Sequence, residues 1–340
     1  MKTSDFFYEL PPELIAQIPA ERRDASRLMV IDRVGGGVCH RFFYDLPQFL
    51  RRGDCLVVNN SRVLPARLLG RRASGGAAEV LLLTDLGEDR WECLVKPGKS
   101  LRGGARVFFG GEQLAGTVES AGEGGTRVIR FEYEGCWNEL LDRLGAPPLP
   151  PYIRQKPPDS ERYQTVYAKP LGSAAAPTAG LHFTGELLDT LREAGIHIAE
   201  VTLHVGLGTF QPVTAEDVKD HRMHTEWYEI PAAAAAAVNQ ARASGGRIVA
   251  VGTTACRTLE SSVSQTGALL PDSGKTGIFI TPGYTFRMTD ALITNFHLPQ
   301  STLLMLVSAF HTREGMLAAY EEAVRERYRF FSFGDAMLIL

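Results

Sequence analysis

The sequence predicts an α/β protein, a mixed sheet with flanking helices, interrupted by an inserted small β-barrel domain. Strand and helix patterns alternate from residue 196 to the C-terminus, which is typical of a sheet covered by helices. Between residues 67 and 133, short strand patterns follow one another across glycine-rich turns with no helix between them, as in a small barrel. The proline-rich run 147–151 predicts a stiff connector back into the first domain. We therefore expect residues 1–66 and 151–340 to form a discontinuous catalytic domain and residues 67–150 to form the inserted barrel.

The first seventy residues predict strands that end in polar side chains. Residues 26–32 and 40–44 read as two strands joined by a glycine turn, and Cys55–Val58 is a short apolar run of the buried type. That run ends in a segment containing Asn60, Arg62 and Arg67, which suits a ligand site at the end of a strand. An Asx-turn followed by a surface strand is the alternative.

The barrel is predicted from five strand patterns and one helix. The strands are expected at residues 79–85, 91–97, 105–110, 113–119 and 126–133, followed by a helix at 136–144. In the second half of the chain, Thr184 is expected to cap a helix that stops at Gly195. Further strands are expected at 196–205, 247–251, 277–280 and 291–295, and helices at 232–245, 256–263, 302–310 and 314–328.

Composition limits the classes of protein and partner. The 340 residues carry a net charge of −3, and no apolar run approaches the roughly 20 residues that span a bilayer. The five cysteines form no C-x-x-C pair, which favours a reducing, cytoplasmic setting. Residues 1–72 hold twelve Lys or Arg and eight Asp or Glu, an excess of four positive charges. Arginines in such number suit phosphate contacts, and a solvated charged face is the alternative.

Three histidines are candidates for proton transfer. His182, His204 and His297 each lie in a glycine- or proline-bounded turn where a strand or loop meets a helix. Turns at the end of a sheet can converge on one site, and a histidine there can take or give protons near neutral pH. A structural histidine beside a helix start is the alternative for each one alone.

A second candidate site is the turn Gly252-Thr253-Thr254 between a strand and a helix. It offers backbone N–H groups and two hydroxyls where open α/β sheets bind small molecules, but it has neither a dinucleotide fingerprint nor a Walker lysine. Arg257 and Glu260 follow on the helix, where a surface ion pair is the simpler interpretation.

The segment His221–Glu229 contains side chains that are common metal ligands. His221, His224 and Glu226 have ligand chemistry, but no H-E-x-x-H pattern or nearby cysteine accompanies them, so no metal is predicted. Glu226 and Trp227 could instead hold a cationic ligand such as a sulfonium.

Eight stretches together resemble the S-adenosylmethionine:tRNA ribosyltransferase-isomerase family of the queuosine pathway. They cover essentially the whole chain, and the barrel strands match least well. The stretches are NSRVLPARL (60–68), YQTVY (163–167), APTAGLHFT (176–184), TLHVGLGTF (202–210), HTEWYE (224–229), GTT with RTLES (252–254, 257–261), ALITNFHLPQSTLLML (291–306) and YRFFSFGDAMLIL (328–340). Ala255-Cys256 departs from the residues usual after the GTT turn.

The resemblance implies transfer and isomerisation of the ribosyl part of S-adenosylmethionine onto 7-aminomethyl-7-deazaguanine at the wobble position of tRNA. The product would be epoxyqueuosine, with adenine and methionine released. S-Adenosylmethionine would be a co-substrate, no prosthetic group is implied, and the enzyme would be a two-domain monomer.

This reaction assigns expected roles to the candidate residues. His182, His204 and His297 are the acid and base candidates, and Gly252, Thr253, Thr254 and Arg257 would hold the methionine carboxylate or ribose hydroxyls. Glu226 and Trp227 would steady the sulfonium. Expected contacts to tRNA are Asn60, Arg62, Arg67, Arg154, Lys156 and Tyr163. Arg22 and Arg23 join them as phosphate contacts, and Phe183, Tyr152 or Tyr163 could stack on the extruded base.

Two other classes of protein remain as alternatives. A methyltransferase would share the co-substrate but favours a glycine-rich first strand–helix turn that this chain lacks. A non-catalytic RNA-binding module would not need seven histidines in one half of the chain.

Overall fold

The computed structural model describes residues 1–122, 125–150, 152–155, 159–206 and 213–340. The chain divides into two compact units. An α/β unit comprises Met1–Arg62, Pro151–Pro170 and Ala176–Leu340, and a barrel unit comprises Val63–Pro150 and Leu171–Ala175. Whether residues 1–66 with 151–340 and residues 67–150 behave as separate folding domains stays a prediction.

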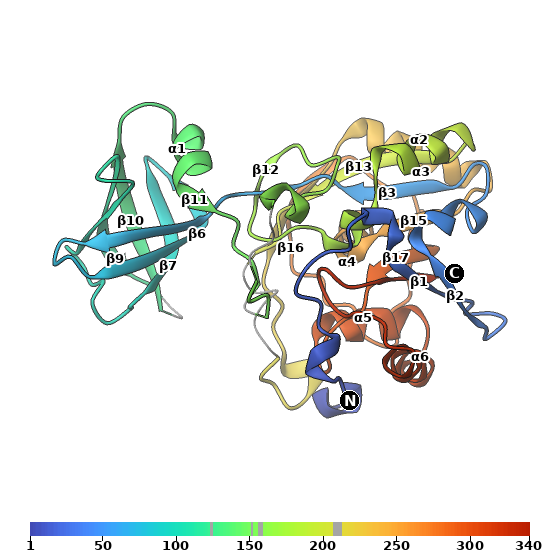
Figure 1. The fold of residues 1–340 in the computed structure, drawn as a ribbon. Coiled ribbons are helices and arrows are strands. Elements are labelled where there is room, and N and C mark those ends of the chain that lie inside the picture. Colours follow the sequence, from blue (N-terminus) through green and yellow to red (C-terminus); the bar gives the residue numbers. More distant parts are fainter. Residues whose placement is uncertain (123–124, 151, 156–158, 207–212) are drawn as a thin grey trace. The chain divides into compact units, whose positions relative to one another are not determined.

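The α/β unit is built on a nine-stranded mixed sheet (Figure 1). Across the sheet the order is β16-β14-β13-β3-β15-β17-β18-β1-β2, and the neighbours β13, β3, β15 and β17 run parallel. The strands are β1 (Arg27–Ile31), β2 (Val38–Phe42), β3 (Cys55–Asn59), β13 (His197–Leu203), β14 (Glu226–Ile230), β15 (Ile248–Val251), β16 (Asp272–Thr276), β17 (Ala291–Asn295) and β18 (Ala336–Ile339).

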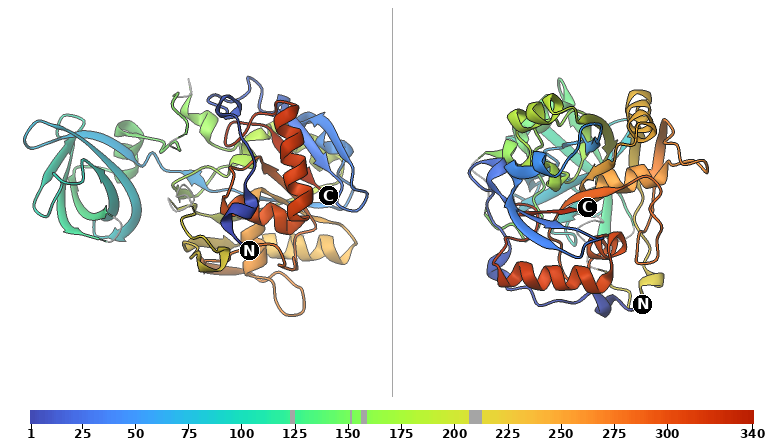
Figure 2. Two further views of the ribbon diagram at one scale, coloured as in Figure 1. Left: turned by 90° about the horizontal axis from the view of Figure 1, so that it is seen from below. Right: turned by 90° about the vertical axis from the view of Figure 1, so that its right-hand side faces the viewer.

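Helices cover both faces of this sheet, as the sequence predicted. Every residue of β3 and β15 is buried, which explains why both strands read as continuous apolar runs. Alternate side chains such as Leu56 and Val249 pack in one core with α2 (Gly185–Glu193) and the 3-10 helix η4 (Phe43–Gln48). The helices α3 (Ala232–Ala243) and α4 (Gly252–Ser261) contact the strands as well (Figure 2).

Local signals fix the helix ends. Thr184 Oγ1 accepts the N–H of Leu187 and caps α2, and Gly195 ends it with φ +81°. Ser301 caps α5 (Thr302–Phe310) in the same way. The last helix, α6, is capped by Thr312 and runs over Arg313–Arg325. It ends three residues earlier than the helix expected at 314–328.

One predicted strand was wrong. Residues 277–280 form no strand, and the strand in this region is β16 (Asp272–Thr276). The reason is the partner strand: β14 pairs with it from Ile230 opposite Asp272 to Glu226 opposite Thr276, and this backbone pairing ends at Thr276.

The barrel unit closes through six antiparallel strands. The order is β5-β6-β7-β10-β9-β8, and β8 pairs back onto β5. The strands are β5 (Arg67–Arg72), β6 (Ala77–Gly87), β7 (Arg90–Lys96), β8 (Arg106–Phe109), β9 (Leu114–Ala121) and β10 (Thr126–Tyr133), with α1 (Trp137–Leu144) and the short β11 (Gly145–Ala146) following.

Sequence reasoning missed β5 because only Leu68 among its six residues is buried, so the strand has no apolar run. Gly70 explains the closure of the barrel. A Cβ atom there would lie 2.3 Å from the carbonyl oxygen of Phe108 and 2.5 Å from the ring of Phe109, so only glycine admits this approach of β8.

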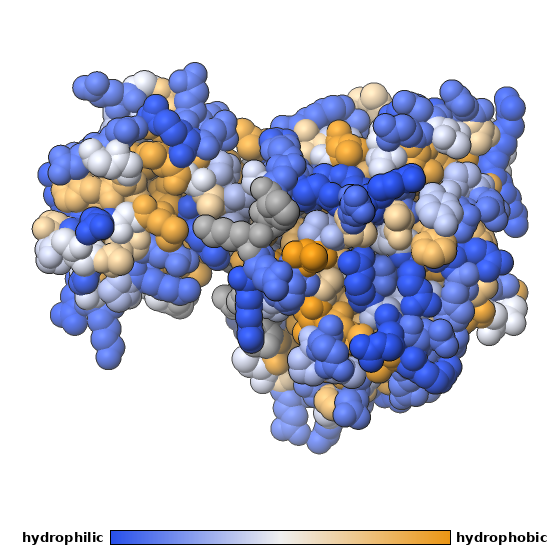
Figure 3. Space-filling view, in the orientation of Figure 1, coloured by the Kyte–Doolittle hydropathy of each residue, from blue (hydrophilic) through white to orange (hydrophobic). Residues whose placement is uncertain are grey.

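The remaining elements are short. They are β4 (Arg62–Val63), β12 (Leu171–Ser173), η1 (Thr3–Phe6), η2 (Pro12–Leu14), η3 (Arg23–Ala25), η6 (Ser160–Tyr163), η7 (Thr178–His182) and η9 (Val218–Asp220). Among the described residues, no helix is both long and apolar enough to cross a membrane. On the face of the α/β unit seen in Figure 3, hydrophobic residues form small patches among hydrophilic ones.

Candidate functional site

The candidate site lies along one edge of the α/β sheet. The parallel strands β13, β3, β15 and β17 all end at this edge, and the antiparallel β18 starts there because Asn295 is paired with Ala336. β1 runs parallel to β18 and starts at the same edge. Strands lie about 4.8 Å apart, so the ends of β13 and β17 are separated by roughly 14 Å. This is where polar groups collect in open α/β sheets.

The Gly252–Thr254 turn lies in the middle of the edge. Gly252 has φ +87°, a conformation that favours glycine, and it turns β15 directly into α4. The position of a Cβ on Gly252 would be 3.6 Å from Ala179 Cβ and 3.6 Å from Thr254 Oγ1, so η7 lies against this turn. Thr254 Oγ1 is buried and has no hydrogen-bond partner.

Glu226 and Arg257 bind each other. Both side chains are almost fully buried, and Arg257 Nη1 donates to Glu226 Oε2 while Glu226 Oε1 accepts the Gly206 N–H at 3.0 Å. In the described part of the chain, the Nη2 group of Arg257 is buried without a partner. The expected surface pair between Arg257 and Glu260 was wrong, because Glu260 instead accepts the backbone N–H groups of residues 287–289.

His204 lies at the end of β13 against Trp227. The two rings stack with centroids 5.1 Å apart and planes 20° apart. Trp227 is 37% exposed, so part of its ring is left for a ligand. Nδ1 of His204 is buried and has no partner among the residues that the structure describes, and burial lowers the pKa of this histidine. The imidazole is therefore neutral at neutral pH, with one ring nitrogen free to exchange a proton.

Tyr167 and Thr165 place two more unpaired hydroxyls at this edge. Both side chains are buried, and neither Tyr167 OH nor Thr165 Oγ1 has a hydrogen-bond partner among the described residues. A Cβ on Gly180 would lie 2.1 Å from Tyr167 OH and 2.8 Å from Thr165 Cγ2. The glycine thus lets η7 approach the hydroxyl of Tyr167.

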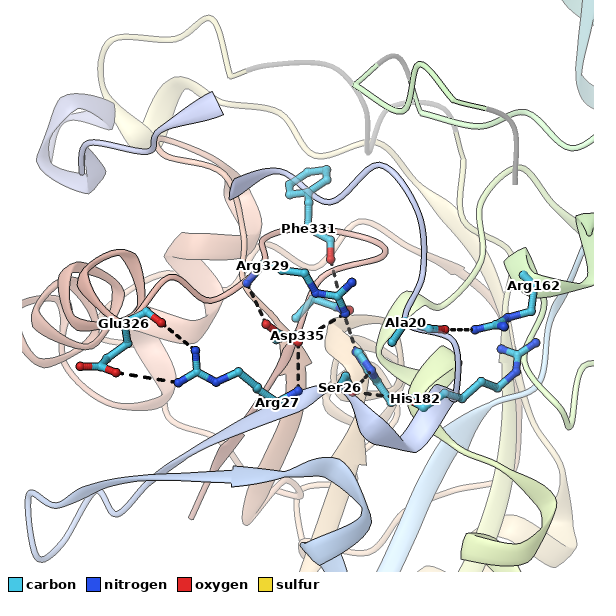
Figure 4. Close-up of polar contacts among 11 residues, drawn as sticks. Ala20, Ser26, Arg27, Arg162, His182, Glu326, Arg329, Phe331 and Asp335 are labelled. Carbon is cyan, nitrogen blue, oxygen red and sulfur yellow. Dashed lines mark hydrogen bonds and ion pairs between the residues drawn. The ribbon is translucent and has the colours of Figure 1, made fainter. Parts of the chain in front are cut away.

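His182 sits in a closed hydrogen-bond network (Figure 4). Its Nδ1 lies 2.7 Å from Ser26 Oγ and its Nε2 lies 3.1 Å from Asn295 Nδ2. Asn295 Nδ2 also faces the carbonyl oxygen of Phe331 at 3.4 Å, and Asn295 Oδ1 accepts from Thr178 Oγ1 at 2.8 Å. Because Asn295 Nδ2 can only donate, Nε2 of His182 accepts this hydrogen bond. The single ring proton of the neutral imidazole therefore lies on Nδ1, which donates to Ser26 Oγ.

Burial and the nearby charges of Arg329 and Arg23 lower the pKa of His182 to about 3. Its ring stacks on Phe43 with centroids 5.0 Å apart. His182 is therefore neutral at neutral pH, and both of its ring nitrogens have partners.

His297 is also buried and neutral. Burial lowers its pKa to about 3, and Nε2 lies 2.9 Å from Thr294 Oγ1. The backbone of His297 donates to Tyr320 OH at 3.0 Å and accepts from Tyr8 OH at 2.5 Å. The structure thus places His182 and His297 at the β17 end of the edge and His204 at the β13 end.

Within the described residues, six side chains along this edge have a buried polar atom without a hydrogen-bond partner. Ser61 and His204 follow the ends of β3 and β13, Thr254 and Arg257 lie on α4, and Thr165 and Tyr167 lie in the segment before η7. An unpaired buried polar group costs about 1–3 kcal/mol. A polar ligand at this sheet edge would supply hydrogen-bond partners to these six groups.

The residues expected to contact tRNA are dispersed. Asn60 is held by Glu200 and Thr202, and the alternative Asx-turn is present at Asn59, whose Oδ1 accepts the Ser61 N–H. Arg62 pairs with Glu161 at 2.6 Å.

The other expected tRNA contacts differ in exposure and position. Arg67 belongs to the barrel unit, where it lies 3.5 Å from Glu79, and Arg154 is exposed. Lys156 lies outside the described residues, as does Leu207–Phe210 of the TLHVGLGTF stretch. Tyr163 and Phe183 are fully buried, so neither ring can stack on a base in this structure.

The suggested metal ligands do not converge. Among the residues that the structure describes, no group of three His, Cys, Asp or Glu side chains could hold a metal ion. Sequence reasoning gave no role to Ser26, Asn295 or Tyr167, although the latter two lie inside stretches quoted above. The available signal was the position of Tyr167 and Asn295 within the YQTVY and ALITNFHLPQSTLLML stretches.

Comparison with known proteins gives consistent results. A family model described as "Queuosine biosynthesis protein" matches residues 3–339. The chain is 60% identical over 341 residues to a protein of Symbiobacterium thermophilum, with all of both chains covered. It is 59% identical over 342 residues to one of Moorella thermoacetica, again with full coverage. Both relatives are named S-adenosylmethionine:tRNA ribosyltransferase-isomerase.

A solved structure is also similar. The crystal structure of S-adenosylmethionine tRNA ribosyltransferase from Thermotoga maritima shares 41% sequence identity with this chain. The match covers 99% of this chain and 100% of that one, with a TM-score of 0.57.

Proposed function

The chain belongs to the queuosine biosynthesis family of S-adenosylmethionine:tRNA ribosyltransferase-isomerases, and from this premise we propose the reaction it catalyses. It transfers and isomerises the ribosyl moiety of S-adenosylmethionine onto 7-aminomethyl-7-deazaguanine at the wobble position of tRNA. Epoxyqueuosine forms, and adenine and methionine leave. The enzyme acts as a cytoplasmic monomer on the anticodon stem-loop and needs no prosthetic group.

The observation that supports a site for this reaction is the row of unpaired polar atoms at the sheet edge. S-Adenosylmethionine presents a carboxylate, an ammonium group, two ribose hydroxyls and a purine, which can supply partners to donors and acceptors alike. The free Nη2 of Arg257 suits the carboxylate, and the hydroxyls of Thr254 and Tyr167 suit the ribose or the purine.

Glu226 has a different role from the one expected for it. Its carboxylate is neutralised by Arg257, so it positions that guanidinium, and the sulfonium contact falls to the exposed part of the Trp227 ring. Gly252 and Thr253 shape the turn that holds the ligand against α4.

Proton transfer is assigned to His204. The reaction needs a base to remove a proton from the carbon next to the sulfonium, and an acid to protonate the departing adenine. His204 is neutral and has an unpaired Nδ1 beside Trp227, so it can accept that proton. His182 and His297 remain in the site as neutral groups that orient their surroundings through Ser26, Asn295 and Thr294.

The test is an incubation of the enzyme with S-adenosylmethionine and an anticodon stem-loop that carries the aminomethyl-deazaguanine base. Nucleosides and small molecules are then identified by mass. Adenine and methionine in equal amounts with epoxyqueuosine are expected. S-Adenosylhomocysteine with a methylated base would instead make the chain a methyltransferase, and bound but unchanged RNA would make it a binding module.

A further inference from the structure

Two arginines lie beside His182, and the sequence predicts a phosphate contact for one of them, Arg23, but gives no role to the other, Arg162. Arg23 and Arg162 line a small pocket together with Ala20, Ser26, His182 and Ser332. The two arginines come from η3 and η6, segments far apart in the chain, and Figure 4 shows Arg162 reaching the backbone at Ala20.

Among the described residues, the hydrogen bonds of both guanidinium groups go to backbone carbonyls. Arg23 donates to the carbonyl oxygens of Leu181 and Glu161, at 3.1 and 2.9 Å. Arg162 donates to those of Glu21 and Ala20, at 2.9 and 2.5 Å. Each guanidinium has five N–H donors, so several remain. One of them, the Nε–H of Arg162, is buried without a partner.

Neither arginine of this pair is neutralised by a direct ion pair among the described residues. Within the described part of the chain, no carboxylate lies within 4.0 Å of either guanidinium, because Glu161 is engaged by Arg62 and Asp24 by Arg22. Burial and the charge of Arg162 lower the pKa of Arg23, and they outweigh the nearby carboxylates of Asp159 and Glu161, which act to raise it. Arg329, paired with Asp335 at 3.5 Å, adds its charge near His182.

We propose that Arg23 and Arg162 seat one phosphodiester group of the tRNA at the β1 end of the sheet edge. This inference rests on the proposed function, since it names the part of the tRNA that reaches this pocket. The position favours a phosphate over the carboxylate of S-adenosylmethionine. The pocket extends from Ser26, which precedes β1, to His182, which is bonded to Asn295 at the end of β17, whereas Arg257 and Thr254 lie on α4, which follows β15. The exposed Arg22 next to the pocket extends the positive surface outward.

A bound phosphodiester group would also supply hydrogen-bond acceptors and a negative charge to the two guanidinium groups. A phosphodiester has two unesterified oxygens and one negative charge, which match a pair of guanidinium groups with spare donors. A purely structural alternative exists, because the two arginines also connect residues 20–23 with 161–162 through their carbonyl contacts. If the two arginines are only structural, substituting either one should lower the stability of the protein but leave the salt dependence of stem-loop binding unchanged.

The experiment measures binding of the anticodon stem-loop by Arg162→Gln and Arg23→Gln across a series of salt concentrations. The control is Arg192→Gln, which removes an exposed arginine of α2 that is paired with Asp189. We expect each pocket variant to weaken binding about 10-fold and to reduce the slope of log Kd against log salt by about 1, with KM for S-adenosylmethionine unchanged. The control is expected to leave both quantities unchanged.

The phosphate itself is identified with stem-loops in which single linkages are neutral methylphosphonates. One linkage is expected to weaken binding by the wild type and to have no further effect on Arg162→Gln. If Arg162→Gln does not fold, Arg162→Lys serves, since it keeps the charge and the salt slope but loses the planar donors. Weaker binding of S-adenosylmethionine with an unchanged salt slope would overturn the proposal, as would stability loss alone. Failure of the proposed function differs, because the wild type would then release no adenine.

Discussion

The hydroxyl of Tyr167 provides the sharpest test of the site. The substitution Tyr167→Phe removes only this oxygen, which is buried without a partner in the free enzyme. The ring, which packs edge-on against Phe183 at 6.5 Å, stays in place. Removing an unsatisfied hydroxyl relieves a desolvation cost of about 1–3 kcal/mol, so we expect the unfolding free energy to stay the same or to rise. The matched control is Tyr320→Phe, which leaves the N–H of His297 without its acceptor and should destabilise the protein by a similar amount.

Although Tyr167→Phe should not destabilise the folded protein, it should weaken the binding of S-adenosylmethionine. If S-adenosylmethionine supplies the missing partner, loss of one hydrogen bond of about 0.5–1.5 kcal/mol weakens its binding about 2- to 10-fold. Unfolding by denaturant without ligand gives the stability, and isothermal titration gives Kd for S-adenosylmethionine. A Tyr167→Phe protein that is as unstable as Tyr320→Phe and binds S-adenosylmethionine like the wild type would refute the reasoning, because the hydroxyl would then have a structural partner.

Three further predictions concern proton transfer, stability and packing. His204→Gln should lower turnover about 100-fold if the ring transfers a proton. Because the pKa of His204 is lowered by burial, the wild-type rate should begin to fall only when pH drops below the ordinary histidine value of about 6.5. Burial works to raise the pKa of Asp54, but the hydrogen bonds from Arg247 outweigh it and the pKa is lowered. The stability that this pair contributes should therefore be complete above the pKa of Asp54 in the unfolded chain, and it should be lost as the pH falls through the pKa of Asp54 in the folded protein. At neutral pH, Asp54→Asn should lower the unfolding free energy measured with denaturant by about 3 kcal/mol. Gly180→Ala should weaken binding of S-adenosylmethionine, measured by calorimetry, at least as much as Tyr167→Phe does, because its Cβ would displace the hydroxyl of Tyr167 and press on Thr165.

Sequence alone determined the elements whose signals are local. The buried runs of β3 and β15, the caps at Thr184 and Ser301, and the αL glycine at Gly195 each depend on a few neighbouring residues. The long matching stretches identified the family, because they need no knowledge of contacts. The mixed sheet and the barrel followed from the alternation of patterns along the chain.

Tertiary structure decided which polar groups are satisfied. The sequence placed three histidines in similar turns, but only the fold shows that both ring nitrogens of His182 have partners while Nδ1 of His204 has none. It also joined Glu226 to Arg257, thirty-one residues apart, and so removed the free carboxylate expected near the sulfonium. The physical reason is that pKa and hydrogen bonding depend on burial and on partners from other strands, and a strand of the sheet finds those partners only when the chain is folded.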